Sequence, residues 1–180
     1  MIGFLGGTFD PIHFGHLNLA LALKEQAGLE EVWFCPAFIN PFKEGKTATS
    51  PLDRLHMLQL ALADIPEFKI VENEIRRQGV SYTVDTIREL MKTTDQSFRL
   101  LLGADQLQTF HRWKEAETLK QLAPPLVGVR TGCQGGIGIP LFDISGTEIR
   151  RRLKENLYVG HFIPSKVLAY IKEKGLYGSK

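Results

Sequence analysis

The sequence predicts an α/β protein with a doubly wound parallel sheet. Short apolar runs alternate along the chain with longer segments that have the composition and end signals of helices. The apolar runs are nearly continuous, whereas a strand with one solvated face would alternate apolar and polar residues. Strands that are buried on both faces and alternate with helices are typical of a sheet covered by helices on two sides.

Glycine, proline and capping residues mark where the predicted strands and helices begin and end. The first apolar run stops at Gly6-Gly7, which suits a strand entering a tight turn, and the Leu- and Ala-rich segment after it stops at Gly28. Ser50 and Pro51 supply the N-cap and the first position of another helix. These signals predict strands at 2–5, 32–35, 68–71, 98–102 and 126–129, and helices at 16–27, from 50 onward, at 83–91, 116–122, 146–155 and 165–174. The glycine-rich stretch 131–138 is predicted to be a flexible surface loop.

Length and composition limit the classes of protein. The chain has 180 residues, enough for a sizeable core, and we expect one domain over residues 1–180. With 22 Lys and Arg against 20 Asp and Glu, the net charge is +2, which argues against binding along a nucleic-acid backbone. No apolar run is long enough to span a membrane, and the N-terminal residues do not resemble a signal peptide. Two cysteines are too few for a disulfide framework, so we expect a cytoplasmic protein.

The most informative motif follows the first predicted strand. It reads Gly6-Gly7-Thr8-Phe9-Asp10-Pro11-Ile12-His13-Phe14-Gly15-His16. In an open α/β sheet, ligands bind beyond the carboxyl ends of the strands, and two glycines let the backbone approach a bulky anion. The spacing of His13 and His16 at a helix start lets both imidazoles face one ligand, and a nearby phosphate should hold them protonated.

Plainer interpretations of this motif also exist. Two histidines at this spacing could bind a metal ion, but no third ligand lies nearby in the sequence. They could also cap or pack without any chemistry. The Gly-Gly turn and Asp10-Pro11 beside the pair make a phosphate site the favoured hypothesis.

Other segments carry both structural and functional interpretations. Ser145 followed by Glu148 is a capping box, which can start a helix without any ligand, while Arg150 one turn later could grip phosphate oxygens. Asp105, after a strand, could accept hydrogen bonds from a ribose or serve as an N-cap. Trp113 could stack on a flat ring or pack in the core.

These motifs, taken together, resemble a known family. The string from Gly6 to His16 resembles the nucleotidyltransferase superfamily, which joins a phosphate to a nucleoside triphosphate. The later motifs are similar, in the same order, to bacterial nicotinate-nucleotide adenylyltransferases, and the resemblance covers nearly the whole chain. These motifs are Ser81-Tyr82-Thr83-Val84-Asp85-Thr86, Gly103-Ala104-Asp105, Trp113, Ile144-Ser145-Gly146-Thr147-Glu148-Ile149-Arg150 and the segment 164–177.

The resemblance implies a Rossmann-like nucleotidyltransferase fold and a reaction. An adenylyl group would pass from ATP to nicotinate mononucleotide, giving nicotinate adenine dinucleotide and pyrophosphate in NAD biosynthesis. Mg²⁺ is expected to arrive with ATP rather than at a metal site built by the protein. We expect no nucleic-acid or membrane partner, and we leave open whether the chain forms a homo-oligomer. The alternatives are an adenylyltransferase for another phosphorylated acceptor, such as phosphopantetheine, and a non-catalytic nucleotide sensor on the same fold.

The resemblance also implies roles for individual residues. His13 and His16 would be the catalytic pair. ATP would be bound by Gly6, Gly7, His16, Gly103, Asp105, Ile144, Ser145, Thr147 and Arg150. The mononucleotide would be bound by Thr8, Phe9, Asp10, Lys43, Ser81, Tyr82, Thr83 and Trp113, with Arg54 as a further phosphate partner. Three positions depart from the family pattern: Asn40 and Phe42 stand where the family has Pro and His, and Gly146 stands where it usually has Ser.

Overall fold

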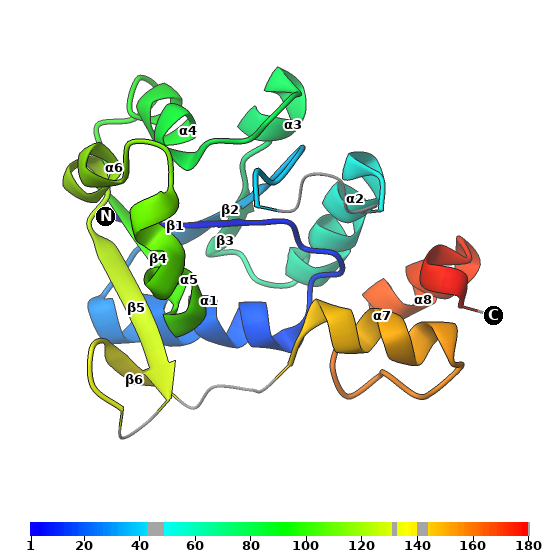
Figure 1. Ribbon diagram of the computed structural model, residues 1–180. Coiled ribbons are helices and arrows are strands. Elements are labelled where there is room, and N and C mark those ends of the chain that lie inside the picture. Colours follow the sequence, from blue (N-terminus) through cyan, green and yellow to red (C-terminus); the bar gives the residue numbers. More distant parts are fainter. Residues whose placement is uncertain (43–48, 131–132, 140–143, 180) are drawn as a thin grey trace.

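The computed structural model describes residues 1–42, 49–130, 133–139 and 144–179. Six strands form one parallel sheet in the order β3-β2-β1-β4-β5-β6 (Figure 1). They are β1 (Ile2–Gly7), β2 (Glu31–Pro36), β3 (Phe68–Ile70), β4 (Phe98–Gly103), β5 (Pro125–Arg130) and β6 (Ile137–Ile139). The predicted α/β class with a doubly wound parallel sheet is confirmed.

Helices cover both faces of this sheet. Figure 1 shows α4 and α6 on one side of it and α1 on the other. The helices are α1 (Phe14–Ala27), α2 (Pro51–Leu62), α3 (Asn73–Arg77), α4 (Thr83–Leu90), α5 (Ala104–Thr109), α6 (Ala116–Leu122), α7 (Gly146–Lys154) and α8 (Ser165–Glu173), with 3₁₀ turns η1 (Phe110–Arg112) and η2 (Leu176–Gly178). No helix among the described residues is long and apolar enough to cross a membrane.

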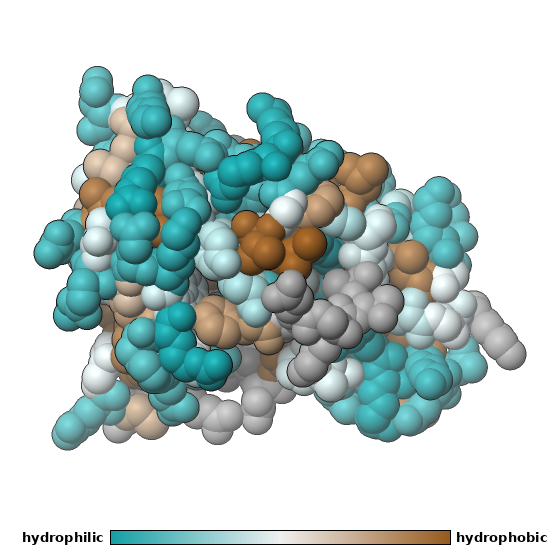
Figure 2. Space-filling view, turned by 45° about the horizontal axis from the view of Figure 1, so that its top comes forward, coloured by the Kyte–Doolittle hydropathy of each residue, from teal (hydrophilic) through white to brown (hydrophobic). Residues whose placement is uncertain are grey.

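The hydrophobic core is divided in two by the sheet. Alternate residues of β1 point to opposite faces, so that Phe4 joins one apolar cluster and Leu5 joins the other. The cluster containing Phe4 includes Val84 and Ile87 of α4, and the cluster containing Leu5 includes Leu23 of α1. This burial on both faces explains why the strands read as continuous apolar runs. Outside the core, the surface seen in Figure 2 is mostly hydrophilic, with small separate hydrophobic areas.

The order of the strands in the sheet predicts where a ligand binds. From β1 the chain adds β2 and β3 on one side, and β4, β5 and β6 follow on the other side. The connections therefore diverge between β1 and β4, which are neighbours in the sheet. At such a switch point a crevice opens beyond the carboxyl ends of the strands.

Several short elements were not predicted from the sequence. The prediction of a loop over 131–138 was wrong at its end, because Ile137–Ile139 forms β6 along β5. A Cβ at Gly136 would lie 2.4 Å from the carbonyl oxygen of Val127, so a glycine lets the chain pass close to β5 there. The helices α3 and α5 and the turns η1 and η2 were also missed. All four are shorter than the length at which a helix is stable by itself, so tertiary contacts must hold them.

Candidate active site

A cleft of about 1250 Å³ opens at the switch point of the sheet. Segments from six parts of the chain meet there: the loop after β1, residues near Phe42, the start of α4, the end of β4 with α5, the Trp113 region and the start of α7. Every site residue predicted from the sequence lines this cleft, except for Lys43, which lies outside the described residues, and Arg54.

His13 and His16 lie together at the start of α1, on one side of the cleft. Their rings stack with centroids 3.7 Å apart and an angle of 25° between the planes. The ring of Phe9 packs edge-on against His16 at 5.1 Å and is itself buried. Gly15 makes this arrangement possible, because a Cβ there would lie 3.0 Å from the His13 ring. The pair is therefore fixed by packing before any ligand binds.

Burial sets the charge state of His13 when no phosphate is bound. The side chain is buried, and Nδ1 has no hydrogen-bond partner within the described part of the chain. Burial lowers the pKa of His13 to about 4, against the partial opposition of a backbone hydrogen bond. The imidazole is thus neutral at pH 7, and only an anion next to it would favour protonation.

The buried His13 should make stability depend on pH. Its pKa is about 4 in the folded protein and about 6.5 in the unfolded chain, so the unfolded state binds more protons between these values. We expect this residue to make the free energy of unfolding about 2 kcal/mol lower at pH 5 than at pH 7. Urea unfolding of the wild type and of His13→Gln at both pH values measures this difference. A wild-type pH dependence equal to that of the variant would contradict the assignment.

The start of α7 forms another wall of the cleft. Ser145 caps this helix by accepting a hydrogen bond from the Glu148 amide at 3.2 Å. The predicted capping box is only half formed, because the Glu148 carboxylate accepts two hydrogen bonds from Arg151 and does not reach back to the N-cap. Other amides of the first turn remain available to an anion, and the helix dipole favours negative charge at this end.

Arg150 connects α7 to the loop after β1. Its Nη1 donates to the carbonyl oxygen of Asp10 at 2.5 Å, and its Nη2 donates to Oγ1 of Thr147 at 3.2 Å. A Cβ at Gly146 would lie 3.1 Å from the Asp10 carbonyl oxygen and 3.2 Å from Arg150 Nη1. The departure from the family pattern at Gly146 therefore gives room for this contact. Arg150 remains partly exposed at the cleft wall, where a phosphate could reach it.

The side chain of Asp10 contacts the C-terminal segment of the chain. Its Oδ1 accepts a hydrogen bond of 2.6 Å from the hydroxyl of Tyr177 near the C-terminus. Burial, followed by the Asp10 carboxylate, raises the pKa of Tyr177 well above its usual value, so the phenol stays protonated and donates. The carboxylate thereby ties the C-terminal segment to the loop that carries the histidines.

The start of α4 lies at the other end of the cleft. The hydroxyl of Ser81 accepts a hydrogen bond from the Phe38 amide at 2.9 Å, so it helps to hold the loop after β2 against the start of α4. Tyr82 is the N-cap of α4 and makes no side-chain cap bond within the described structure. The first-turn amides are therefore the donors best placed for an anion.

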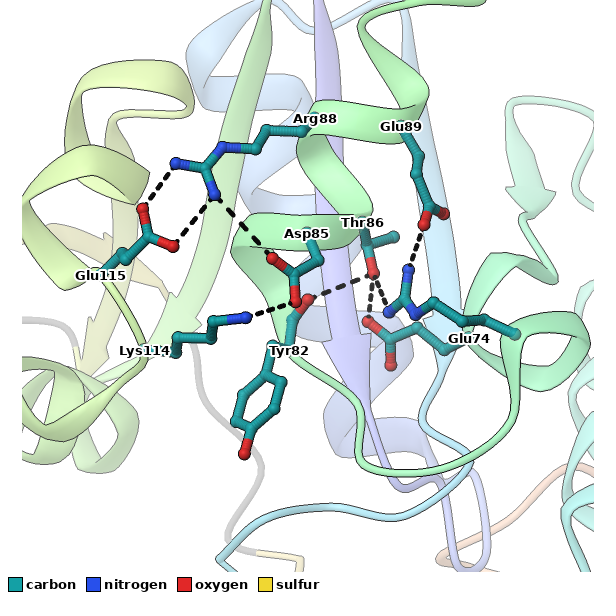
Figure 3. Close-up of polar contacts among 9 residues, drawn as sticks. Glu74, Tyr82, Asp85, Thr86, Arg88, Glu89, Lys114 and Glu115 are labelled. Atoms are coloured by element: carbon teal, nitrogen blue, oxygen red, sulfur yellow. Dashed lines mark hydrogen bonds and ion pairs between the residues drawn. The ribbon is translucent and has the colours of Figure 1, made fainter.

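Two ion pairs join α4 to the segment that carries Trp113. Figure 3 shows Lys114 pointing to Asp85 and the guanidinium of Arg88 facing the carboxylate of Glu115. The distances are 2.8 Å from Lys114 Nζ to Asp85 Oδ2, and 3.0 and 2.5 Å for the two Arg88–Glu115 bonds. The Trp113 ring also packs on the buried ring of Phe110, with centroids 5.4 Å apart.

Glu74 is a buried carboxyl at the cleft that the sequence did not reveal. It accepts a hydrogen bond from the Thr86 hydroxyl at 2.8 Å, and Arg77 in turn donates to Thr86 at 3.0 Å (Figure 3). Burial raises the pKa of Glu74, while the hydrogen bonds from Thr86 and Ser81 oppose that shift. No motif marks this residue, because its partners become neighbours only when α3 packs beside α4.

Arg54, predicted as a further phosphate partner, lies buried behind the cleft. Its side chain is 1% exposed and does not line the cleft. The guanidinium donates to the carbonyl oxygens of Thr8 at 2.7 Å, Thr49 at 3.0 Å and Phe38 at 3.1 Å. Arg54 therefore holds together two loops that border the cleft.

Comparison with known proteins assigns the chain to a family. A family model described as cytidylyltransferase-like matches residues 4–152. A Geobacillus thermodenitrificans protein named a probable nicotinate-nucleotide adenylyltransferase is 39% identical over 99% of this chain and 87% of its own length. A Bacillus cereus protein of the same name is 40% identical over 99% of this chain and 98% of its own length.

A solved structure has the same fold at lower identity. The Plasmodium falciparum nicotinic acid mononucleotide adenylyltransferase complexed with NaAD superimposes with a TM-score of 0.81 at 20% identity, covering 99% of this chain and 98% of the other. The fold supports the grouping that the more similar bacterial relatives establish. The chain belongs to the nicotinate-nucleotide adenylyltransferase family of cytidylyltransferase-like proteins.

Proposed function

We propose that this protein transfers an adenylyl group from ATP to nicotinate mononucleotide, releasing nicotinate adenine dinucleotide and pyrophosphate. The observation that carries the proposal is that one cleft joins two kinds of subsite. The stacked His13–His16 pair and the start of α7 suit phosphates, whereas Trp113 and the start of α4 suit a flat, acidic ring. A nucleotide acceptor that carries a pyridine carboxylate needs both.

The chemistry requires little from the protein except position and charge. The attacking group is the phosphate of the mononucleotide, which is already ionised at neutral pH, so neither a general base nor a protein nucleophile is needed. Attack at the α-phosphorus forms one P–O bond and breaks the bond to pyrophosphate. Catalysis then depends on in-line positioning and on stabilising charge that develops on the phosphates.

We assign the phosphate contacts to the histidine end of the cleft. His13 and His16 would donate to the reacting phosphate, and an anion beside His13 would raise its pKa above that of the free protein. Arg150 and the first-turn amides of α7 would hold the leaving pyrophosphate. Thr8 and Lys43 would orient the acceptor phosphate. Asp105 would accept hydrogen bonds from the adenosine ribose. Its carboxylate packs against Gly103, where an added Cβ would lie only 2.7 Å from Asp105 Oδ1.

Mg²⁺ is part of this proposal as a companion of ATP. Mg²⁺ commonly binds substrate phosphates together with waters and one or two carboxylates. Bound with ATP, it would supply positive charge that offsets the negative charge of the phosphates. Among the described residues, no three His, Cys, Asp or Glu side chains gather where they could hold a metal ion. We also propose a cytoplasmic setting, since Cys35 and Cys133 are free thiols.

A pyrophosphate-release assay with ATP and three acceptors tests the proposed function. Nicotinate mononucleotide should support turnover, and phosphopantetheine should support none above background. The ratio of turnover with nicotinate mononucleotide to turnover with nicotinamide mononucleotide measures how strongly the start of α4 selects the carboxylate. Turnover with phosphopantetheine alone would favour the rival acceptor, and absence of turnover with every acceptor would favour a nucleotide sensor.

Trp113→Ala should separate the two substrates. Loss of the stacking face should raise KM for the mononucleotide about tenfold and change KM for ATP less than twofold. Trp33→Phe is the matched control, because Trp33 does not line the cleft and bonds Glu31 instead. Equal increases in both KM values would mean that Trp113 supports the structure and does not contact the pyridine.

A further inference from the structure

The hydroxyl of Tyr177 joins the C-terminal segment to the loop after β1. Tyr177 belongs to η2, which packs against α7 and α8 near the C-terminus (Figure 1). Its ring packs against the apolar core, and its hydroxyl donates to Asp10 Oδ1 at 2.6 Å. Asp10 lines the cleft, whereas Tyr177 does not. Tyr177 therefore reaches the site through Asp10 and not through a substrate.

The backbone on both sides of this hydrogen bond has an unusual conformation. Tyr177 has φ 58° and ψ 18°, which is the left-handed region that residues with a Cβ rarely adopt. Phe9, which precedes Asp10, also has a positive φ of 49°. Such residues persist where the surrounding contacts hold them, and they cluster at functional sites. The contact between Tyr177 and Asp10 is therefore the kind of feature that calls for a functional explanation.

The Asp10 carboxylate is nearly buried and needs partners. Its side chain is 8% exposed, and a buried charge is costly unless it is paired and hydrogen-bonded. Arg150 Nη1 lies 4.0 Å from Asp10 Oδ2, which is a long ion pair, because this nitrogen donates instead to the Asp10 carbonyl oxygen at 2.5 Å. The short bond from Tyr177 therefore satisfies an oxygen of the carboxylate that Arg150 does not reach.

Arg150 is the cation that would move if the Tyr177 hydroxyl were removed. Arg54 also interacts electrostatically with Asp10, but it is buried and its guanidinium donates to three backbone carbonyl oxygens. Arg150 is 35% exposed and lines the cleft. A guanidinium has N–H groups beyond those that Arg150 uses on Asp10 and Thr147, so it can also donate to a phosphate. An unsatisfied Asp10 carboxylate would compete with that phosphate for Arg150.

We infer that Tyr177 is a positioning residue for the phosphates of ATP. By donating to Asp10 Oδ1, it keeps the Asp10 carboxylate from drawing Arg150 into a direct ion pair, so that Arg150 stays available to the phosphates. This inference rests on the proposed function, in which Arg150 holds the leaving pyrophosphate. It gives the C-terminal segment a part in ATP binding, although that segment contributes no side chain to the cleft lining within the described residues.

Removing the single hydroxyl of Tyr177 tests the inference. Tyr177→Phe should raise the Kd for ATP with Mg²⁺ about fivefold in titration calorimetry, because a charge-assisted bond from Arg150 to the phosphates is weakened. KM for ATP should rise by a similar factor, and KM for the mononucleotide should change less than about twofold. Tyr170→Phe is the matched control, since the Tyr170 hydroxyl donates to Asp53 at 2.7 Å and neither residue lines the cleft. It should leave both KM values and the Kd unchanged.

An Arg150→Ala background separates positioning from a general structural role. If Tyr177 acts through Arg150, then Tyr177→Phe should change the Kd for ATP less than about twofold once Arg150 is already absent. If the Tyr177 hydroxyl only stiffens the loop that carries the histidines, its loss should weaken ATP binding by the same factor in both backgrounds. Melting temperatures within a few degrees of the wild type verify that the variants are folded.

Three results would overturn the inference. They are an unchanged Kd for ATP in Tyr177→Phe, an equal increase in Tyr170→Phe, and an equal increase in the Arg150→Ala background. The titration needs no acceptor, so its outcome is independent of the acceptor assigned above. If the wild type makes no dinucleotide, the proposed function fails while the titration still tests Tyr177; if it does and the Kd series is flat, only the inference about Tyr177 fails.

Discussion

His16→Ala should lower kcat about 100-fold while the protein remains folded. Removing one donor that stabilises charge in the transition state typically costs a factor of this size. His16 is the member of the pair whose ring packs between His13 and Phe9, so its loss also frees His13 to move. Rates of pyrophosphate release at saturating ATP and mononucleotide measure the effect.

His56→Ala provides the control for this experiment. His56 is exposed on α2, packs against Tyr170 and does not line the cleft. Its removal should leave kcat unchanged. Near-normal turnover by purified, folded His16→Ala would show that the phosphate chemistry is done elsewhere.

Arg54→Met should produce the largest loss of stability. The substitution removes one buried and two partly buried hydrogen bonds to loop carbonyls, and each such loss costs about 1 kcal/mol. We expect the free energy of unfolding to fall by about 3 kcal/mol, as measured by urea denaturation. Turnover should fall as well, because Arg54 holds the loops that contain Thr8 and Phe38, and these loops border the cleft.

Arg151→Met is the matched surface substitution. Arg151 bonds the carboxylates of Glu148 and Glu155, but its side chain is 49% exposed. Exposed ion pairs contribute about 0–1 kcal/mol, so this variant should lose less than 1 kcal/mol. If Arg54→Met were no more destabilised than Arg151→Met, the three carbonyl contacts of Arg54 would not carry the stability assigned to them.

The parts of the fold that follow from local signals were predictable. The Ser50-Pro51 start of α2 is confirmed, with Ser50 accepting a hydrogen bond from the Asp53 amide. Gly28 ends α1 in a left-handed conformation, as its position after a Leu- and Ala-rich run predicts. The apolar run near 98–102 became β4, a central strand. In each case the residues next to one another in the sequence determine the structure.

The features that were missed depend on distant residues. β6 exists through its pairing with β5, and nothing local in a glycine-rich stretch predicts a partner. The structural role of Arg54 becomes visible only when the carbonyl oxygens of Thr8, Phe38 and Thr49, from two loops, converge on it.

The candidate site also contains residues that local sequence signals reveal and residues that only the folded structure reveals. The residues of the first motif could be found because they are consecutive, and the resemblance to the family linked them to the later motifs. Glu74 had no such signal, because its place at the cleft is visible only when α3 packs beside α4 and Thr86 donates to it. Position in the sheet, rather than sequence spacing, brings these side chains to one cleft.

The central claim is that an oxygen of the nicotinate mononucleotide phosphate forms the new bond to the α-phosphorus of ATP. Mononucleotide carrying ¹⁸O at all of its terminal phosphate oxygens tests this claim, with the products analysed by mass spectrometry. This bond formation predicts nicotinate adenine dinucleotide that retains every label and pyrophosphate that carries none. Label in the pyrophosphate, or no dinucleotide at all from ATP and nicotinate mononucleotide, would contradict the account.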